Sequence, residues 1–363
     1  MAAKPLRIVF AASPEIAVPC LTEVAQRATV GAGVRAGLKP ALTPAPTPAP
    51  AIIPVAVLTN PDSPKGRSKE PEPTDIGRAA MELGLPLLKP AKLDAEARSA
   101  IAAFQPDLLV SFAYGKIFGP KFLGLFPLGG INIHPSLLPK YRGPTPINAA
   151  ILRREGETGL SIQTLAAEMD AGDILAQKAI PLSTSETAET LSKTIAELAP
   201  SMLIPLLQEI AANGITALPK TKQNEADATY CKLLTKDDGR IDWNKSALDI
   251  DAQIRAYKPW PPCYTLHGDK LLYVLEGMVG ETGVVGTRLA VSLQPGASGA
   301  PPGTEVPGTI LAADKSLGGI AIQTGDGVYI ATKLQYAGKK ALGWKDFLNG
   351  ARDLTGYIFS AML

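Results

Sequence analysis

Short apolar runs alternate with segments of helical periodicity through the first 140 or so positions. Strand-like runs occupy residues 7–11, 55–59, 86–88, 107–112 and 130–134. Helical spacing of apolar side chains marks residues 19–27 and 75–83. Strands that alternate with helices favour right-handed crossovers and an open, mostly parallel sheet. The pattern therefore predicts an α/β domain with a Rossmann-like sheet.

The pattern changes in the second half of the chain. From Ser185 to Ala212 apolar residues recur at helical spacing, and Pro200 predicts a break into two segments. From Gly239 onward short apolar runs alternate with turns, which predicts a small β-rich domain. We therefore predict a first domain, a linker and a second domain at residues 1–213, 214–232 and 233–363.

Two stretches rich in Pro and small residues interrupt this organisation. One covers residues 28–54 and contains an alternating Pro segment from Thr43 to Pro50, and the other covers about 280–307. Such composition favours extended polyproline II and cannot bury a core. Both stretches are interpreted as surface insertions.

Composition limits the class of protein. The chain has 363 residues, of which 46% are hydrophobic and 19% charged, which is enough apolar material for packed, globular domains. The start lacks the apolar core of a signal peptide, and no stretch is expected to span a membrane. Three widely spaced cysteines without a C-x-x-C pair indicate neither a disulfide framework nor a zinc site. We expect a cytoplasmic, monomeric protein.

Net charge is only +2, so bulk charge does not indicate a nucleic-acid binder. Any RNA contact must then come from local clusters, such as Lys333, Lys339 and Lys340. Without further information such a cluster is more often a solvated face.

Candidate chemistry is concentrated in the run G-G-I-N-I-H-P-S-L-L-P-K-Y-R-G. Asn132 and His134 are two positions apart on a predicted strand, so their side chains leave the same face. They lie where that strand ends, which on a parallel sheet is the ligand-binding edge. The alternative is that Asn132 satisfies a turn and His134 is a hydrogen-bonded core histidine.

The motif N-I-H-P-S-L-L-P, followed by an Asp-x-Gly-Asp segment at residues 170–173, resembles the signature of the 10-formyltetrahydrofolate-dependent formyltransferases. The resemblance implies a catalytic set of Asn132, His134 and Asp170. It also implies a folate-binding loop made of Ser136, Leu137, Leu138 and Pro139. In that reading 10-formyltetrahydrofolate is the co-substrate.

Formyl transfer explains why these residue types are needed. An amine attacks the formyl carbon, and the oxygen of the resulting tetrahedral species gains negative charge. An Asn amide and a protonated His supply preorganised donors to that oxygen. The Asp can receive the proton of the amine, directly or through water. The reaction requires neither a metal nor a covalent enzyme intermediate.

The motif alone admits glycinamide ribonucleotide, an amino sugar nucleotide or a charged tRNA as acceptor. T-N-P-D-S-P-K-G-R-S-K is similar to a basic loop of the family members that act on methionyl-tRNA, and it assigns Arg67, Lys65 and Lys69 to tRNA binding. Segments of the C-terminal half, among them R-A-Y-K-P-W-P and Q-Y-A-G-K-K, resemble the same members in the same order. This likeness implies that residues 233–363 form a small β-barrel of the oligonucleotide-binding kind, with Lys339 and Lys340 near tRNA.

The expected reaction is therefore transfer of the formyl group of 10-formyltetrahydrofolate to the α-amino group of methionyl initiator tRNA, for translation initiation. A formyltransferase acting on an amino sugar nucleotide is the enzymatic alternative. A nucleotide- or RNA-binding protein without catalysis is the alternative of another class. Against it, no G-x-G-x-x-G follows the first strand, and RNA binding alone would not need the catalytic set.

Overall fold

The computed structural model describes residues 4–32, 51–64, 70–280, 305–314, 317–351 and 354–360. The chain divides into two compact units. The first unit comprises Met1–Pro146, Glu157–Pro181 and Leu191–Lys232. The second unit comprises Ile147–Gly156, Leu182–Thr190 and Leu233–Leu363.

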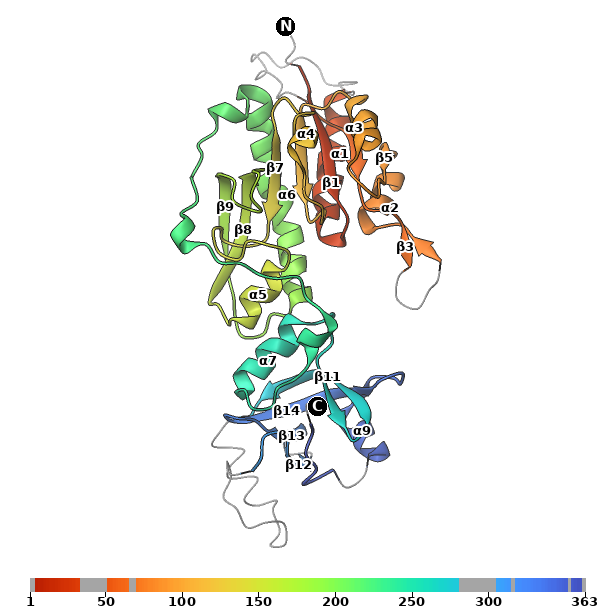
Figure 1. The fold of residues 1–363 in the computed structure, drawn as a ribbon, viewed down its shortest axis with the longest axis vertical. Coiled ribbons are helices and arrows are strands. Elements are labelled where there is room, and N and C mark those ends of the chain that lie inside the picture. The colour runs from red at the N-terminus through yellow and green to blue at the C-terminus, as the bar shows by residue number, and fades with distance from the viewer. Residues whose placement is uncertain are drawn as a thin grey trace, which may run out of the picture. The chain divides into compact units, whose positions relative to one another are not determined.

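A seven-stranded sheet with the order β5-β2-β1-β6-β7-β8-β9 organises the first unit (Figure 1). Its strands are β1 (Leu6–Ala12), β2 (Ile52–Leu58), β5 (Leu87–Leu88), β6 (Leu108–Phe112), β7 (Gly130–His134), β8 (Glu157–Thr164) and β9 (Ile174–Pro181). The pairings from β5 to β7 are parallel, whereas β8 pairs antiparallel with both β7 and β9. The predicted α/β domain with an open, mostly parallel sheet is confirmed. A two-stranded ribbon, β3 (Ser63–Pro64) with β4 (Pro71–Glu72), follows β2.

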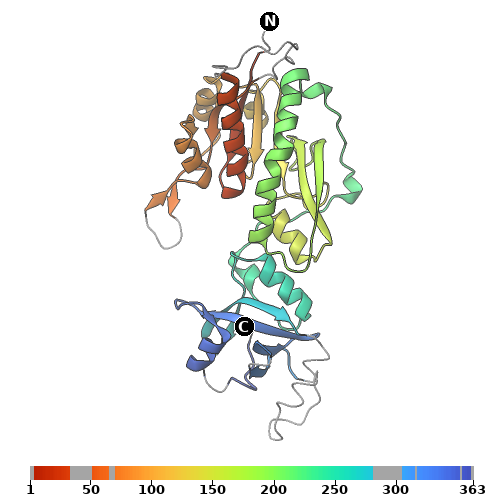
Figure 2. The ribbon, with the colours of Figure 1, turned by 180° about the vertical axis from the view of Figure 1, so that it is seen from behind.

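Helices cover both faces of this sheet. They are α1 (Val18–Ala32), α2 (Asp75–Glu82), α3 (Ala95–Ala102), α4 (Pro120–Leu123) and α6 (Ala188–Asn213). Helix α5 (Pro146–Leu152) belongs, apart from its first residue, to the second unit. Helices α1 and α6 lie on one face, seen in front in Figure 2, and α3 and α4 lie on the other. Side chains of Thr74 and Asp94 cap α2 and α3 by accepting from Gly77 N and Ala97 N.

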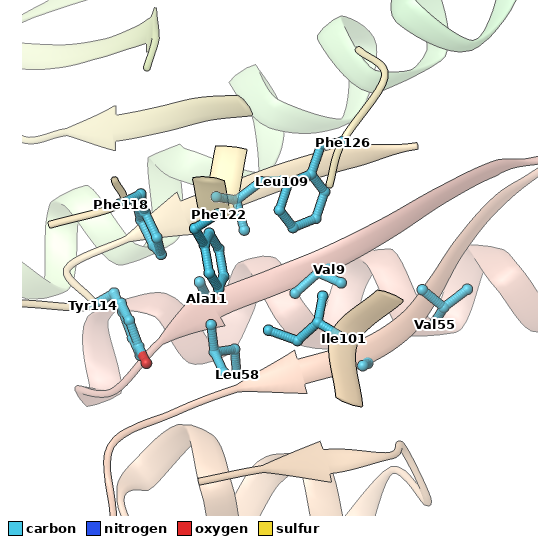
Figure 3. Packing of buried hydrophobic residues seen from close by; sticks show 11 residues of the cluster. Val9, Ala11, Val55, Leu58, Ile101, Leu109, Tyr114, Phe118, Phe122 and Phe126 are labelled. Atoms are coloured by element: carbon cyan, nitrogen blue, oxygen red, sulfur yellow. The ribbon is translucent and has the colours of Figure 1, made fainter. Parts of the chain in front are cut away.

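The α3/α4 face of the sheet packs on a continuous apolar core (Figure 3). Val9 of β1, Leu109 of β6 and Ile101 of α3 are buried there. Phe122 of α4 stacks on Phe118, with ring centroids 5.2 Å apart. Because alternate residues of a strand face opposite sides, β1 buries both of its faces, as central strands of parallel sheets do.

Helix α6 corrects the predicted break at Pro200, because it continues through both Pro200 and Pro205. Leu191, Ile195 and Leu203 are among the buried residues of one helical stripe. Each such side chain stabilises the helix by about 1.5–3 kcal/mol when buried, so several of them outweigh the ~3 kcal/mol that an interior proline costs. Tertiary packing therefore decides where this helix ends.

The same helix bears on the prediction that no stretch spans a membrane. Among the described residues, Ala188–Asn213 is long and apolar enough by length and composition, but a core helix passes the same test, so this property does not indicate a span. Its buried residues include Leu191, Ile195 and Leu203.

The second unit contains an antiparallel sheet with the order β10-β11-β14-β13-β12, to which β15 adds beside β14. Its elements are α7 (Ala247–Ala256), β10 (Tyr264–His267), β11 (Lys270–Val279), β12 (Ile310–Asp314), β13 (Gly319–Gln323), β14 (Val328–Tyr336), β15 (Leu342–Gly343) and α9 (Trp344–Gly350). Ser360 bridges Leu266 of β10, and Ile358 bridges Thr309 beside β12. One C-terminal segment thus joins both edges of the sheet, which gives the open barrel that the family resemblance implied.

Both predicted insertions are shorter in the structure than the sequence indicated. Helix α1 extends to Ala32 and β2 begins at Ile52, so the ends of the stretch 28–54 belong to regular elements. Strand β11 ends at Val279. The central parts, 33–50 and 281–304, lie outside the described residues.

Candidate active site

Strand β7 presents the predicted Asn and His at its carboxyl end. Asn132 is half-buried and His134 is buried, with two-residue spacing that directs both side chains to one face. In the antiparallel register with β8, Asn132 lies opposite Gln163 and His134 opposite Ser161. The antiparallel strand therefore adds polar side chains beside the two predicted ones.

Asp170 comes from the tight connection between β8 and β9. Its backbone is left-handed, with φ of 54°, which is uncommon for a residue with a side chain. Asp173 N donates to Thr164 Oγ1 at 3.0 Å and Thr164 N to Asp173 O at 2.9 Å, which closes the loop. A Cβ at Gly172 would lie 1.7 Å from Thr164 O, so only glycine fits there.

The loop brings the Asp170 carboxylate against both β7 residues. Asn132 Nδ2 donates to Oδ1 at 3.3 Å, and His134 Nδ1 lies 3.6 Å from Oδ2. Two further donors complete the contacts: Gln163 Nε2 at 3.0 Å from Oδ1 and Gly143 N at 2.9 Å from Oδ2. The three residues predicted from the motif are thus adjacent, and the carboxylate between them is held by fixed donors.

The second nitrogen of His134 defines how its ring can act. His134 Nε2 lies 2.8 Å from the carbonyl oxygen of Tyr141, which can only accept a hydrogen bond. Nε2 therefore carries a hydrogen, and in the neutral ring Nδ1 holds the lone pair. Since Nδ1 faces Asp170, it is the atom through which the ring can gain or release a proton.

Hydrogen bonds to neighbouring residues hold the segment Ser136–Pro139 in place. Ser136 Oγ is buried and donates to Lys140 O at 2.6 Å, so this hydroxyl holds the loop. Ser161 Oγ accepts from Leu138 N at 3.2 Å, and Gln177 Nε2 donates to Leu138 O at 3.0 Å. Leu137 and Pro139 remain partly exposed and are the loop side chains that can face a ligand.

A cysteine lies beside the site without being suited to nucleophilic work. Cys231 Sγ accepts from Thr145 N at 3.3 Å. Burial raises the pKa of the Cys231 thiol, and the negative charge of Asp170 adds to the effect. The thiol therefore stays protonated near neutral pH, so the site favours direct transfer over a cysteine-bound intermediate.

The predicted basic residues fall in two places. Lys65, Arg67 and Lys69 lie outside the described residues, between β3 and β4. Lys339 and Lys340 are exposed on the turn between β14 and β15 of the second unit. Among the described residues no group of three or more His, Cys, Asp or Glu side chains could hold a metal ion.

The motif did not predict the residues behind the catalytic cluster. Gln163, Gln223 and Gly143 contact Asp170 or its neighbours, and buried Arg142 contacts Gln223. One signal was present in the sequence: Gln163 follows Ser161 in the alternating strand run L-S-I-Q-T, which places both polar side chains on one face of the strand. Gln223 had none, because it reaches the site from a polar connecting segment.

Comparison with known proteins places this geometry in a class. Residues 50–207 match the family of formyl transferases, and residues 233–352 match the C-terminal domain of formyl transferases. An N-formyltransferase from Helicobacter canadensis, solved with folinic acid and dTDP-3-aminofucose, shares the fold at a TM-score of 0.57 and 17% identity, over 90% of this chain and 98% of that one. The fold and the matched domains define a two-domain formyl-transferring enzyme.

Relatives in bacteria narrow the class. A methionyl-tRNA formyltransferase of Treponema denticola is 41% identical over 357 residues, covering 96% of this chain and 98% of the relative. One of Roseiflexus castenholzii is 40% identical over 303 residues, covering 83% and 89%. The chain therefore belongs to the methionyl-tRNA formyltransferase family.

Proposed function

We propose that this enzyme transfers the formyl group of 10-formyltetrahydrofolate to the α-amino group of methionyl initiator tRNA. The products are N-formylmethionyl-tRNA and tetrahydrofolate, and the reaction serves translation initiation in the cytoplasm. The observation that carries the proposal is the convergence of Asn132, His134 and Asp170 on one point at the carboxyl edge of the sheet. Full-length relatives named methionyl-tRNA formyltransferase support the choice of acceptor.

In the proposed reaction Asn132 and His134 stabilise the developing oxyanion. The Asn132 amide has two N–H groups, so one can contact Asp170 while the other faces the formyl oxygen. A proton on His134 Nδ1 is shared between Asp170 and the same oxygen, because Nε2 is already bonded to Tyr141 O. Both donors are held before reaction, which is what lowers the cost of forming the charge.

Asp170 carries the proton in this scheme. The amine nitrogen forms a bond to the formyl carbon and loses one proton to the Asp170 carboxylate, directly or through water. When the tetrahedral species collapses, the bond between the formyl carbon and the folate nitrogen breaks. The same proton then passes to that nitrogen, so Asp170 ends the cycle as a carboxylate.

Folate and tRNA are assigned to separate surfaces. Leu137 and Pro139 are exposed enough to contact the pterin, while Ser136 and Leu138 hold the loop. We assign Lys65, Arg67, Lys69, Lys339 and Lys340 to the tRNA, as the family resemblance implies.

The alternative acceptor is an amino sugar nucleotide. A solved neighbour was crystallised with dTDP-3-aminofucose, but at 17% identity that likeness supports the fold alone. Matches of 33–41% identity over most of the chain are to proteins named for methionyl-tRNA. We therefore favour the tRNA.

The test is a formylation assay with purified enzyme, 10-formyltetrahydrofolate and either methionyl initiator tRNA or a nucleotide-linked amino sugar. We expect N-formylmethionyl-tRNA to accumulate with stoichiometric loss of 10-formyltetrahydrofolate, and no turnover of the sugar. Turnover of the sugar alone would establish the alternative. Absence of turnover with either acceptor, in folded protein, would remove the proposed function.

A further inference from the structure

Arg142 is the largest side chain that is completely buried in the described part of the chain, and it stands next to the catalytic cluster. Its guanidinium donates to Gln223 Oε1 from Nε at 3.1 Å and from Nη2 at 2.9 Å. It also pairs with Glu225 through bonds of 2.8 and 2.7 Å, and donates to Tyr230 Oη at 3.1 Å. The hydrogen bond with Glu225 raises the pKa of Arg142 further and lowers that of Glu225, so both stay charged.

A guanidinium has donors and no acceptor, which fixes the orientation of its neighbour. The oxygen of the Gln223 amide must face Arg142, so Nε2 must face away from it. There Nε2 lies within hydrogen-bond distance of three oxygens: Gln163 Oε1 at 3.0 Å, Asp170 O at 2.8 Å and Gly172 O at 2.7 Å. All three are acceptors, so the amide fits in one orientation only.

The same logic fixes Gln163. Because its Oε1 accepts from Gln223, its Nε2 must point the other way, and it donates to Asp170 Oδ1 at 3.0 Å. The charge of Arg142 is thereby linked to the catalytic carboxylate through two amides whose dipoles are aligned.

Gln223 also holds the backbone that carries Asp170. Asp170 has φ of 54°, a conformation that costs about 1–3 kcal/mol for residues with a side chain. Gln223 Nε2 donates to the carbonyls of Asp170 and Gly172, which both belong to the loop after β8. These bonds favour the one loop conformation that directs the carboxylate toward His134.

We propose that Gln223 and Gln163 are positioning residues for formyl transfer, oriented by buried Arg142 so that their amide donors place the Asp170 carboxylate. This inference rests on the proposed function of Asp170. Neither glutamine is required to touch a substrate, so each acts on turnover through Asp170.

Two substitutions at one position distinguish two roles of Gln223: placing the Asp170 carboxylate, and merely accepting the hydrogen bonds of Arg142. Gln223→Met keeps the size of the side chain and loses the amide. Gln223→Glu keeps an acceptor for Arg142 and loses the donor toward Asp170. We expect both variants to lower kcat by about 10- to 100-fold, the range for a displaced catalytic group. KM for 10-formyltetrahydrofolate and for methionyl-tRNA should change less than about threefold.

Asn224→Ala is the matched control, because Asn224 is the exposed neighbour whose side chain bonds Ala226 N and Asp227. It should leave kcat unchanged. Full activity of Gln223→Glu would mean that Gln223 only satisfies Arg142, and it would overturn the proposal. Thermal unfolding of each variant reports folding, and Gln163→Leu provides a second route to the same loss if Gln223→Met does not fold.

A double-mutant cycle identifies the residue through which the glutamine acts. In an Asp170→Ala background, Gln223→Met should change the residual kcat by less than about twofold, because its target is gone. A further loss of tenfold or more in that background would show an independent role and overturn the proposal. If Asp170→Ala alone leaves turnover intact, the proposed function fails instead, so the two failures are distinguishable.

Discussion

At the residue scale, the Asp170 carboxylate is held by donors from three segments of the chain, and a fourth segment holds the Asp170 backbone. The carboxylate accepts from Asn132 of β7, Gln163 of β8 and Gly143 of the loop before α5, whereas Gln223, from the connection after α6, donates to Asp170 O. Fixed donors of this kind lower the reorganisation needed when charge moves during a reaction. We therefore expect removal of each donor to lower kcat measurably.

Asn132→Ala, His134→Ala and Asp170→Ala should each lower kcat severely. Losing one preorganised donor typically costs about 100- to 1000-fold in rate. Circular dichroism and thermal unfolding should show that the fold is retained, since these side chains line the site rather than the apolar core. Asn213→Ala, which removes an amide at an exposed position bonded to Glu209, serves as the control and should be fully active. Near-normal turnover in any folded member of the set contradicts its catalytic role.

Gln177→Leu tests the folate loop separately from the catalytic set. Gln177 Nε2 bonds Leu138 O and Ser161 Oγ, so its loss should loosen the loop. A hydrogen bond is worth about 1 kcal/mol, which predicts roughly a fivefold increase in KM for 10-formyltetrahydrofolate. The value of kcat should stay within about twofold, and Lys178→Ala, at the neighbouring exposed position of the same strand, should change neither kcat nor KM. A fall in kcat with unchanged KM would place Gln177 in the catalytic cluster instead.

The catalytic set could be predicted from sequence, whereas its supports could not. Two-residue spacing on a strand directs Asn132 and His134 to one face, and the family motif supplied Asp170. Gln163 depends on the register between β7 and β8, which no local pattern encodes. Gln223 depends on how a polar segment returns to the site, and only the buried charge of Arg142 explains why it must.

At the scale of elements, strand pairing and helix packing determine the position of the Asp170 loop and the length of α6, which local sequence preferences do not specify. The antiparallel pairing of β8 with β7 places Thr164, at the end of β8, beside Ile131, and the loop that follows β8 returns along β7 so that Asp170 reaches Asn132 and His134. Helix α6 shows the same rule, since its buried stripe continues where Pro200 predicted an end. Local signals set where elements begin, and burial set how far they extend.

Leu203→Ala tests the contribution of α6 to stability. Leu203 is completely buried, so its truncation removes apolar contacts and leaves a cavity. We expect the free energy of unfolding of the first unit to fall by about 2–5 kcal/mol, measured by urea denaturation. Glu197→Ala, at an exposed position of the same helix, should change it by less than about 0.5 kcal/mol. A loss below about 1 kcal/mol for Leu203→Ala would mean that the helix packs less tightly than its burial indicates.

At the scale of the whole molecule, two units with separate cores divide the chain. The first holds the catalytic cluster, and the second forms the open barrel, where Trp243 stacks on Phe359 and donates to Thr265 Oγ1. The segment 221–231 hydrogen-bonds within the first unit, including Arg142 N to Thr229 O at 2.9 Å. A fragment of the first unit must therefore extend to Lys232, because ending at Asn213 would remove every described side-chain partner of Arg142.

The last prediction separates tRNA recognition from formyl transfer in the full chain. If Arg67 binds a phosphate or the backbone of the tRNA, then Arg67→Ala removes a charge-assisted contact worth about 1.5–3 kcal/mol. That loss corresponds to roughly a 10- to 100-fold fall in kcat/KM for methionyl-tRNA. A double variant, Lys339→Ala with Lys340→Ala, should lower kcat/KM at low salt by a smaller factor than Arg67→Ala does. Each lost phosphate contact should reduce the slope of log K for tRNA binding against log salt concentration by about one unit.

Affinity for 10-formyltetrahydrofolate, measured directly by fluorescence or calorimetry, should stay within about twofold in all of these variants, because none of the three residues belongs to the proposed folate loop. Lys121→Ala removes one exposed positive charge from α4 and controls for net charge; it should leave both substrates unaffected. Equal loss of folate binding in Arg67→Ala would show that the basic loop serves the co-substrate. Undiminished tRNA-dependent activity in both Arg67→Ala and the double lysine variant would require the tRNA to bind through other surfaces, and the division of labour between loop, barrel and catalytic cluster would then be wrong.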